Sequence, residues 1–189
     1  MTGVPAVILA GGLATRMGGG DKGLRPWKEA TLLDAIIALL TPQAGPLALN
    51  ANGDPARFAR FGLPVLPDPV PGNPGPLAGV LAAMLWARGL RQERVLTVPC
   101  DTPDLPGDLI VRLADGDAGC GAMAAGADGE LQPTVALWPV ALADSLAAHL
   151  TRGGRRMRGF AAGAGLVAVP FAGTSPDPFR NINHPGELE

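Results

Sequence analysis

A glycine-rich segment carrying one arginine and one lysine directly follows the first apolar run of the chain. This segment, residues 9–23, reads LAGGLATRMGGGDKG. Glycine lets backbone N–H groups approach an anion closely, because it has no Cβ and adopts positive φ at little cost. Arg16 and Lys22 can neutralise phosphate charge, the guanidinium as a planar fork and the ammonium as a point charge. A loop of this kind after a strand is typical of nucleotide binding in α/β proteins.

The segment matches neither of the two best-known phosphate loops. It lacks GxxxxGK[ST], and its GxGxxG match at residues 18–23 lies well past the strand end, with no ribose-binding acid at the right distance. What remains, LAGGxxxRMG followed by a lysine, closely resembles the nucleotidyltransferase signature. The MGGGDKG detail resembles the molybdenum cofactor guanylyltransferases of the MobA family. A plain glycine-rich turn is the alternative, because glycine doublets are common in a chain with 27 glycines.

Composition and charge favour one ordinary globular domain spanning residues 1–189. The net charge of −2 and the pI of about 5.7 indicate no excess of basic residues, so we expect no nucleic acid partner.

Cys100 and Cys120 have no CxxC spacing, and we expect both to be buried small hydrophobes in a reducing compartment. Because no targeting segment or membrane span is visible, we expect a cytoplasmic protein without a membrane partner.

Apolar runs alternate with amphipathic stretches along the chain. The expected strands are residues 4–9, 46–50, 64–66, 94–98, 122–125, 134–138 and 166–169. The expected helices are residues 31–40, 55–61, 76–88, 106–113 and 140–150, with Pro76 and Pro106 in first turns. Apolar strands alternating with helices indicate an α/β fold with a mostly parallel sheet covered on both faces. The family resemblance implies a three-layer α/β/α, Rossmann-like nucleotidyltransferase fold.

Polar residues follow the first four expected strands. The glycine segment follows the first, Asn50 ends the second, Asp68 follows the third and Asp101 follows the fourth. Ligands of open parallel sheets gather at the carboxyl ends of the strands, so these residues should share one rim. Asp101 is the best candidate ligand for Mg²⁺, which takes one or two carboxylates plus substrate phosphates. The alternative is that Asp101 caps a helix or forms an Asx turn.

The family resemblance implies roles for these residues. The PCDTP sequence around Asp101 resembles the acidic metal motif of the family, which implies Mg²⁺, with Mn²⁺ as an alternative ion. The implied catalytic residues are Arg16, Lys22 and Asp101. The implied GTP-binding residues are Leu9, Ala10, Gly11, Gly12, Lys22, Asn50, Asp68 and Asp101. Asn50 and Asp68 also carry groups suited to a purine edge or a ribose hydroxyl, although a turn asparagine and a loop aspartate remain the alternatives.

Two further segments are candidates for binding a second, pterin substrate. A cationic run at residues 155–158 follows two glycines and can clamp a phosphate, but solvated surface is the alternative. The segment NINHP at residues 181–185 is similar to the NxNxP motif of the family, near the expected pterin site, whereas a plain turn is the alternative. The candidate pterin-binding residues are Arg155, Arg156, Asn181 and Asn183.

The resemblance implies transfer of GMP from GTP to the terminal phosphate of the molybdenum–molybdopterin cofactor, with release of pyrophosphate. His149 and His184 lie outside the nucleotide motifs, so no general base is evident. None is needed, because a phosphate nucleophile is already ionised near pH 7. A cytidylyltransferase for the same cofactor and a non-catalytic nucleotide- or cofactor-binding protein are the alternatives. We expect a monomer, with acceptor molybdoenzymes or their chaperones as candidate partners.

Overall fold

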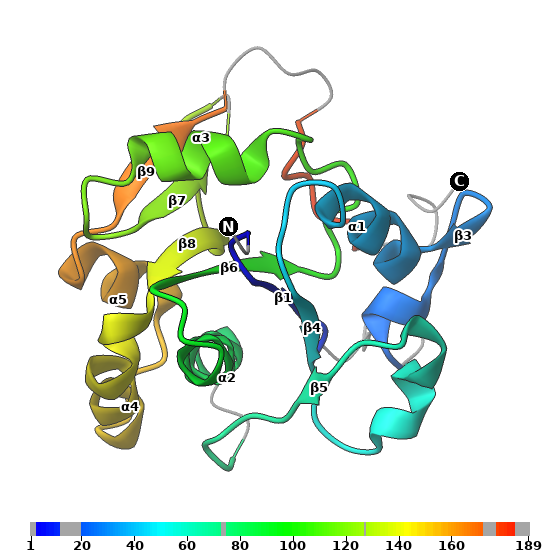
Figure 1. Ribbon diagram of the computed structural model, residues 1–189, viewed down its shortest axis with the longest axis horizontal. Helices are drawn as coiled ribbons and strands as arrows, with labels where there is room; N and C mark the ends of the chain where they lie inside the picture. The colour runs from blue at the N-terminus through cyan, green and yellow to red at the C-terminus, as the bar shows by residue number, and fades with distance from the viewer. Residues whose placement is uncertain (1–2, 12–19, 73–74, 127, 172–176, 184–189) are drawn as a thin grey trace.

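A seven-stranded sheet in the order β5-β4-β1-β6-β8-β7-β9 forms the centre of the molecule (Figure 1). The computed structural model describes residues 3–11, 20–72, 75–126, 128–171 and 177–183. The strands are β1 (Ala6–Leu9), β4 (Leu47–Asn50), β5 (Val65–Leu66), β6 (Arg94–Pro99), β7 (Ala122–Ala125), β8 (Leu131–Pro139) and β9 (Val167–Pro170). β8 is antiparallel to β6 and β7, and the other neighbouring pairs are parallel. The predicted mostly parallel sheet is confirmed.

Helices cover both faces of this sheet, as Figure 1 shows. On one face lie α1 (Leu32–Leu40) and α3 (Leu109–Gly116), and on the other lie α2 (Pro76–Gly89), α4 (Ala143–Thr151) and α5 (Met157–Gly163). Successive strand side chains point to opposite faces, so Ile8 packs with the α1–α3 cluster and Val7 with the α2 cluster. The three-layer α/β/α fold is therefore confirmed. None of the helices in the described ranges combines the length and apolar character that a bilayer crossing demands.

Short elements connect β1 to α1 and extend the edges of the fold. They are the 3₁₀ turns η2 (Lys22–Leu24), η3 (Pro55–Phe61) and η4 (Val140–Leu142), and the hairpin of β2 (Pro26–Trp27) and β3 (Ala30–Thr31). Thr31 caps α1 through a capping box with Asp34, so the hairpin leads directly into that helix. Trp27 packs with Leu32 and Ile182, which ties the hairpin to the C-terminal segment.

Some element boundaries differ from the sequence predictions. The helix expected at residues 106–113 begins only at Leu109. Its early N–H group on Ile110 is bound by the Gln43 side chain, which also donates to the carbonyl of Pro106, so Pro106 stays outside the helix. The helix expected at residues 140–150 divides into η4 and α4, and α5 was not predicted. The strand expected at residues 134–138 is longer, as β8.

The two cysteines differ in exposure. Cys100 is buried, as expected, whereas Cys120 is exposed, so the prediction that both are buried is wrong. Cys120 lies in the turn between α3 and β7, where the Asp117 carboxylate accepts the N–H groups of Gly119 and Gly121. These hydrogen bonds close the turn around Asp117 and leave the intervening Cys120 outside the core.

Candidate active site at the carboxyl edge of the sheet

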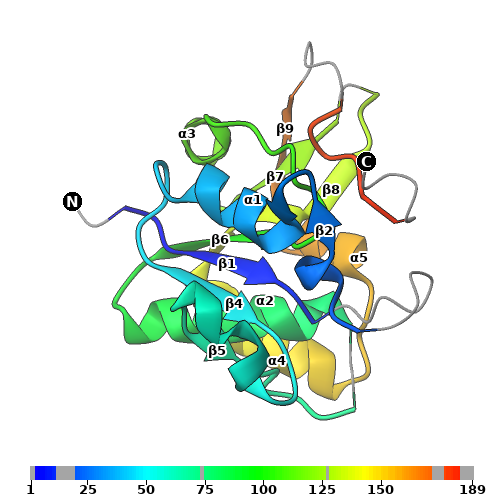
Figure 2. The same ribbon diagram turned by 90° about the vertical axis from the view of Figure 1, so that its right-hand side faces the viewer.

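The carboxyl ends of β5, β4, β1 and β6 meet at one edge of the sheet. The register pairs Leu9 with Asn50 on one side and with Pro99 on the other. Ala10 N donates to Asn50 O over 2.8 Å, and Cys100 N donates to Leu9 O over 3.2 Å. In Figure 2 this edge lies on the right, where the β1 arrow points. The predicted convergence of the four strand ends on one rim is confirmed.

Lys22 occupies the centre of this edge. Its Nζ donates to Asp101 Oδ2 over 2.5 Å and to Asn183 Oδ1 over 2.6 Å. The Lys22 and Asp101 side chains are only 13% and 18% exposed, so their ion pair is partly shielded from solvent. Ile182 N also donates to Asp101 O over 2.8 Å, which fixes the C-terminal segment beside the pair. Three segments that are far apart in sequence thus meet at one ammonium group.

Close packing at Gly23 positions Lys22. A Cβ at residue 23 would lie 2.7 Å from Leu33 Cγ and 3.3 Å from Cys100 Cβ, so only glycine fits there without a shift of its neighbours. The η2 turn is thereby pressed against α1 and against the segment that follows β6. Because Lys22 begins that turn, its side chain is directed at Asp101, one residue past Cys100.

A second polar group lies across the β1 end, where β4 and β5 finish. Asn50 Nδ2 donates to Asp68 Oδ1 over 2.9 Å and to Leu66 O over 3.0 Å. Asn52 Nδ2 donates to Asp68 Oδ2 over 2.8 Å, and Asp68 N returns a bond to Asn52 Oδ1 over 2.9 Å. The Asp68 carboxylate is therefore held in one orientation by two amides. Asn52, two residues after Asn50 in LNANG, is one of the polar residues at the end of the second expected strand, but the sequence did not single it out as a binding residue.

The α2 helix approaches this group closely through Gly79. A Cβ there would lie 2.2 Å from Asn50 Oδ1 and 2.8 Å from Leu9 Cδ2. A Cβ on Gly11 would lie 4.0 Å from the same Asn50 oxygen. The Asn50 amide thus sits between α2 and the start of the glycine segment. Gly12 and Arg16 lie outside the described residues.

The sequence comparison assigns this arrangement to a family. A model described as the MobA-like NTP transferase domain matches residues 6–164, which include both polar groups of the site apart from the C-terminal asparagines. This chain belongs to the MobA-like NTP transferase family. The resemblance seen in residues 9–23 is confirmed, and the fold is that of a nucleotidyltransferase.

Curated members of the family are similar over nearly the whole chain. A molybdenum cofactor guanylyltransferase of Rhodopseudomonas palustris (strain BisB5) is 48% identical, over 97% of this chain and 90% of the relative. One from Acidiphilium cryptum is 49% identical, over 97% and 91%. The crystal structure of molybdopterin-guanine dinucleotide biosynthesis protein A from Archaeoglobus fulgidus superposes with a TM-score of 0.78, at 19% identity, over 98% of this chain and 95% of that one.

The candidate pterin-binding residues are only partly brought together. Asn183 joins Lys22 directly, whereas Asn181 is exposed. Arg155 and Arg156 are also exposed, and Arg155 donates to the carbonyls of Leu150 and Gly154. Arg156 is the N-cap residue of α5, which packs on the sheet face of α2 and α4, whereas Phe179 of the C-terminal segment packs with the α1–α3 cluster. The structure therefore does not join the two arginines to the Lys22 group.

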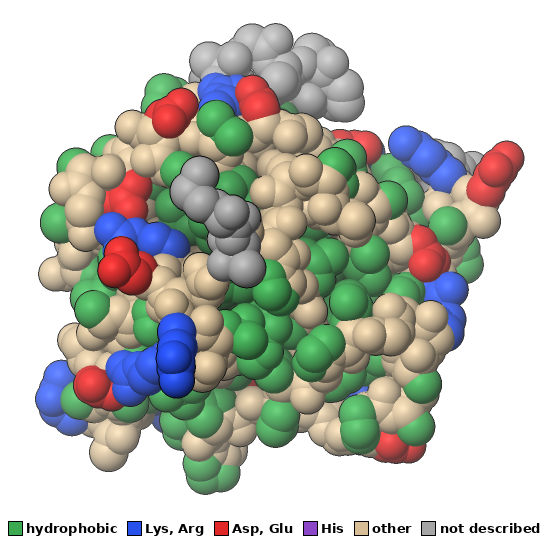
Figure 3. Space-filling view, in the orientation of Figure 1, with side chains coloured by type: hydrophobic (Ala, Val, Ile, Leu, Met, Phe, Trp, Pro, Cys, Tyr) green, Lys and Arg blue, Asp and Glu red, His purple; other side chains and the backbone are tan. Residues whose placement is uncertain are grey.

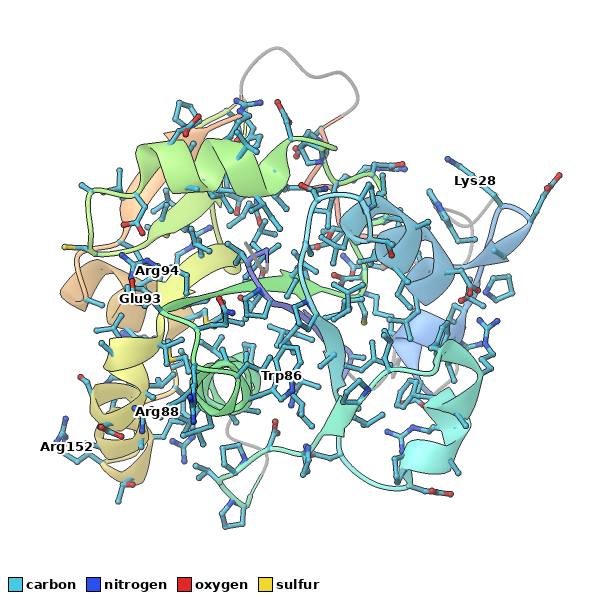
Figure 4. All side chains as sticks on the ribbon, viewed as in Figure 1. Lys28, Trp86, Arg88, Glu93, Arg94 and Arg152 are labelled. Carbon is cyan, nitrogen blue, oxygen red and sulfur yellow. The ribbon has the colours of Figure 1, made fainter. Side chains whose placement is uncertain are left out.

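Other arginines belong to the opposite side of the molecule. Arg94 begins β6, at the strand end opposite to the site, and pairs with Asp117 over 2.7 Å. Arg88 near the end of α2 pairs with Asp144 over 3.1 Å. Figure 4 shows both arginines on the left side, over β6 and α4. On the face seen in Figure 3, lysine and arginine lie among aspartate and glutamate, so their charges are largely balanced locally.

Buried Cys100 is not a nucleophile in this site. Burial, followed by the charge of Asp101, raises the pKa of the Cys100 thiol to about 12, so the thiolate is not formed near neutral pH. No group of three His, Cys, Asp or Glu side chains gathers anywhere in the described ranges. A metal ion at Asp101 would therefore draw further ligands from amides, water or substrate phosphates, as Mg²⁺ commonly does.

Proposed function

We propose that this chain transfers GMP from GTP to the terminal phosphate of the molybdenum–molybdopterin cofactor and releases pyrophosphate. The observation that carries the proposal is the convergence of Lys22, Asp101 and Asn183 beside the end of β1. These groups are a cation, a carboxylate and an amide oxygen, and they lie beside the glycine segment proposed to bind phosphate. Such a set suits a reaction that joins two phosphorylated substrates. The names of the relatives support the same activity.

The chemical obstacle in such a transfer is that one anion attacks another. Two like charges about 4 Å apart repel by about 4 kcal/mol at an effective dielectric constant of about 20. The attacking phosphate is already ionised near pH 7, so the residues need only position it and offset the repulsion. Lys22 and Arg16 would supply the positive charge and stabilise the departing pyrophosphate.

Asp101 is the proposed ligand of Mg²⁺, with Mn²⁺ as the alternative ion. The donors suit such an ion, because the Asp101 carboxylate and the Asn183 amide oxygen already contact one cation, the Lys22 ammonium. Both are hard oxygen donors, and Mg²⁺ needs only one or two carboxylates beside substrate phosphates. When bound, the ion supplies charge stabilisation for the phosphate oxygens.

The nucleotide would lie across the β1 end. Within residues 9–12 the Ala10 N–H already donates to Asn50 O, so we propose that the N–H groups of Gly11 and Gly12 bind phosphate oxygens, with Leu9 and Ala10 beside them. Asn50 and Asp68 would bind guanine or the ribose. Each Asp68 oxygen accepts one amide N–H and has a further lone pair, so the carboxylate can accept another donor from the base or sugar. For the pterin substrate we propose Arg155, Arg156, Asn181 and Asn183.

The direct test mixes the chain with Mg²⁺, GTP and the molybdenum–molybdopterin cofactor and measures pyrophosphate release. We expect release with GTP and much slower release with CTP. Faster release with CTP would support the cytidylyltransferase alternative. Binding of GTP in calorimetry without any release would support the non-catalytic alternative and contradict the proposed reaction.

Two substitutions test the roles of the Lys22 pair. Lys22→Ala should lower turnover by about 100-fold or more, which corresponds to about 3 kcal/mol of activation free energy. The matched control is Lys28→Ala, because Lys28 is exposed at the hairpin tip, where Figure 4 shows it pointing outward. Asp101→Asn should abolish most activity and its Mg²⁺ dependence. Near-normal turnover in Lys22→Ala, or an unchanged metal titration in Asp101→Asn, would remove that residue from the mechanism.

A further inference from the structure

Arg57, on the η3 turn, connects two parts of the candidate site that come from different segments. Its Nε lies 2.6 Å from Asp21 Oδ2, and its Nη2 donates to Asn52 O over 2.5 Å. Its Nη1 donates to Asp54 O over 2.7 Å, and its guanidinium carbon lies 4.7 Å from the centre of the Phe58 ring. The guanidinium therefore spans from the loop after β4 to the residue that precedes Lys22.

Asp21 is the unusual partner in this contact. It is the N-cap residue of η2, but its side chain accepts no capping hydrogen bond from the turn. Aspartate at an N-cap commonly accepts an N–H from the following residues. Here the carboxylate turns to Arg57 instead, and only 18% of the Asp21 side chain is exposed. The Asp21 side chain thus forms an ion pair with η3 in place of a capping hydrogen bond within η2.

The position of Asp21 makes its charge a problem for nucleotide binding. It lies within the glycine segment directly before Lys22, and adjacent Cα atoms are only about 3.8 Å apart. An uncompensated carboxylate there would repel the triphosphate that the glycine segment and Lys22 attract. The positive charge of the Arg57 guanidinium, which the carbonyls of Asn52 and Asp54 hold beside Asp21, would offset this repulsion.

Resting on the function proposed above, we propose that Arg57 is a positioning residue that neutralises Asp21 and holds it away from the nucleotide phosphates. The guanidinium also donates a hydrogen bond to the backbone carbonyl of Asn52, and the Asn52 side chain in turn orients Asp68. Removal of Arg57 therefore acts on GTP binding through the freed charge of Asp21. The consequence is specific, because removal of the Asp21 charge should cancel the defect.

The experiment measures GTP affinity in Mg²⁺ by calorimetry, and KM and kcat by pyrophosphate release, for Arg57→Gln, Asp21→Asn and the double variant. Arg57→Gln should weaken GTP binding and raise KM by about tenfold, the size of one desolvated charge contact, with a smaller change in kcat. Asp21→Asn should bind GTP at least as tightly as wild type. The double variant should return to within about threefold of wild type, since coupled neighbours are not additive. Arg57→Lys, which keeps the charge but loses the separate Nη contacts to Asn52 O and Asp54 O, should retain more GTP affinity than Arg57→Gln.

Arg60 supplies a matched control on the same turn. It pairs with Asp34 over 2.6 Å and stacks over the Phe61 ring at 4.2 Å, so it makes the same kinds of contact away from the site. Arg60→Gln should leave GTP affinity within about twofold, which is the range expected for a mutation outside the site. If Arg57 had a purely structural role, Arg57→Gln would lower the melting temperature in parallel with GTP affinity, and Asp21→Asn would not restore that affinity.

Two outcomes would overturn the proposal: Arg57→Gln binding GTP as Arg60→Gln does, or the double variant binding GTP no more tightly than Arg57→Gln. Failure of the proposed function has a different signature, in which the wild-type chain binds GTP but releases no pyrophosphate. In that case the affinity measurements still decide the role of Arg57. A wild-type chain that binds no GTP would overturn both proposals.

Discussion

Replacing Gly79 with alanine should damage the nucleotide site through a single methyl group. Gly79 lies in the first half of α2, where the helix passes the end of β1. The added Cβ would lie 2.2 Å from Asn50 Oδ1, 3.0 Å from Asn50 Cγ and 2.8 Å from Leu9 Cδ2. The Leu9 methyl group can rotate away, but Asn50 is only 4% exposed and its amide is held by hydrogen bonds to Asp68 Oδ1 and Leu66 O. The substitution therefore has to displace the Asn50 side chain or the helix.

The expected loss in the free energy of unfolding follows from three contributions. Overpacking of a filled interior costs about 1–3 kcal/mol. Loss of the two Asn50 hydrogen bonds, to Asp68 and to the carbonyl of Leu66, costs about 1 kcal/mol each. Alanine is favoured over glycine in a helix by about 1 kcal/mol. The net destabilisation is about 2–4 kcal/mol, which lowers the melting temperature by about 5–15 °C for a chain of this size.

Thermal melting and steady-state kinetics together test this reasoning. Gly89→Ala is the control, because that residue lies in the same helix with no atom within 4 Å of its added Cβ, so helix propensity alone should act. Gly79→Ala should also raise KM for GTP by about tenfold with little change in kcat, since Asn50 and Asp68 are proposed to bind the nucleotide uniformly. If Gly79→Ala is as stable as Gly89→Ala and keeps the wild-type KM, the contact between α2 and Asn50 is not tight and Gly79 does not hold the Asn50 amide in place.

Two further predictions concern charge and thiol chemistry. Burial raises the pKa of Asp117, but hydrogen bonds from Arg94 and two backbone N–H groups outweigh it and hold that pKa below its ordinary value. Because the pKa of Asp117 is lower in the folded state, its ionised carboxylate stabilises the fold above about pH 4, and this stabilisation is lost as the pH falls through the pKa of the folded state. The difference in melting temperature between wild type and Asp117→Asn should therefore be largest near neutral pH and shrink in acid. A difference that does not change with pH would contradict this prediction. Exposed Cys120 should react with a thiol reagent at pH 8, whereas Cys100, with its raised pKa, should react only on unfolding; equal rates would refute this.

The rim of the site could be predicted because it depends on short-range patterns. Each apolar run is bounded by glycine, proline or a polar residue, so the strand ends were visible in the sequence. Parallel strands share one carboxyl edge, and Asn50, Asp68 and Asp101 therefore had to converge once the strands were assigned. Their positions are confirmed by the structure, whereas their roles in binding remain predictions.

Features that depend on distant partners could not be predicted. The α5 helix has the sequence MRGFAAG, whose glycines and alanines give no clear periodicity, and its packing against β8 stabilises it. The start of α3 is set by Gln43, whose side chain binds an N–H group 67 residues away. The bond between Lys22 and Asn183 joins residues 161 positions apart. Such contacts follow from the folded arrangement, and no local pattern encodes them.

The pairing of charges in the site cannot be predicted from the residue types alone. In sequence, Lys22 is an isolated cation beside a glycine loop, which suggests a group free to attract phosphate. In the structure its charge is shared with Asp101, and the neighbouring Asp21 is paired with Arg57. The proposed attraction of Lys22 for a triphosphate therefore depends on which partner each of the two cations keeps when the nucleotide binds. The proposed role of Arg57, a residue outside every motif, follows from its pairing with Asp21.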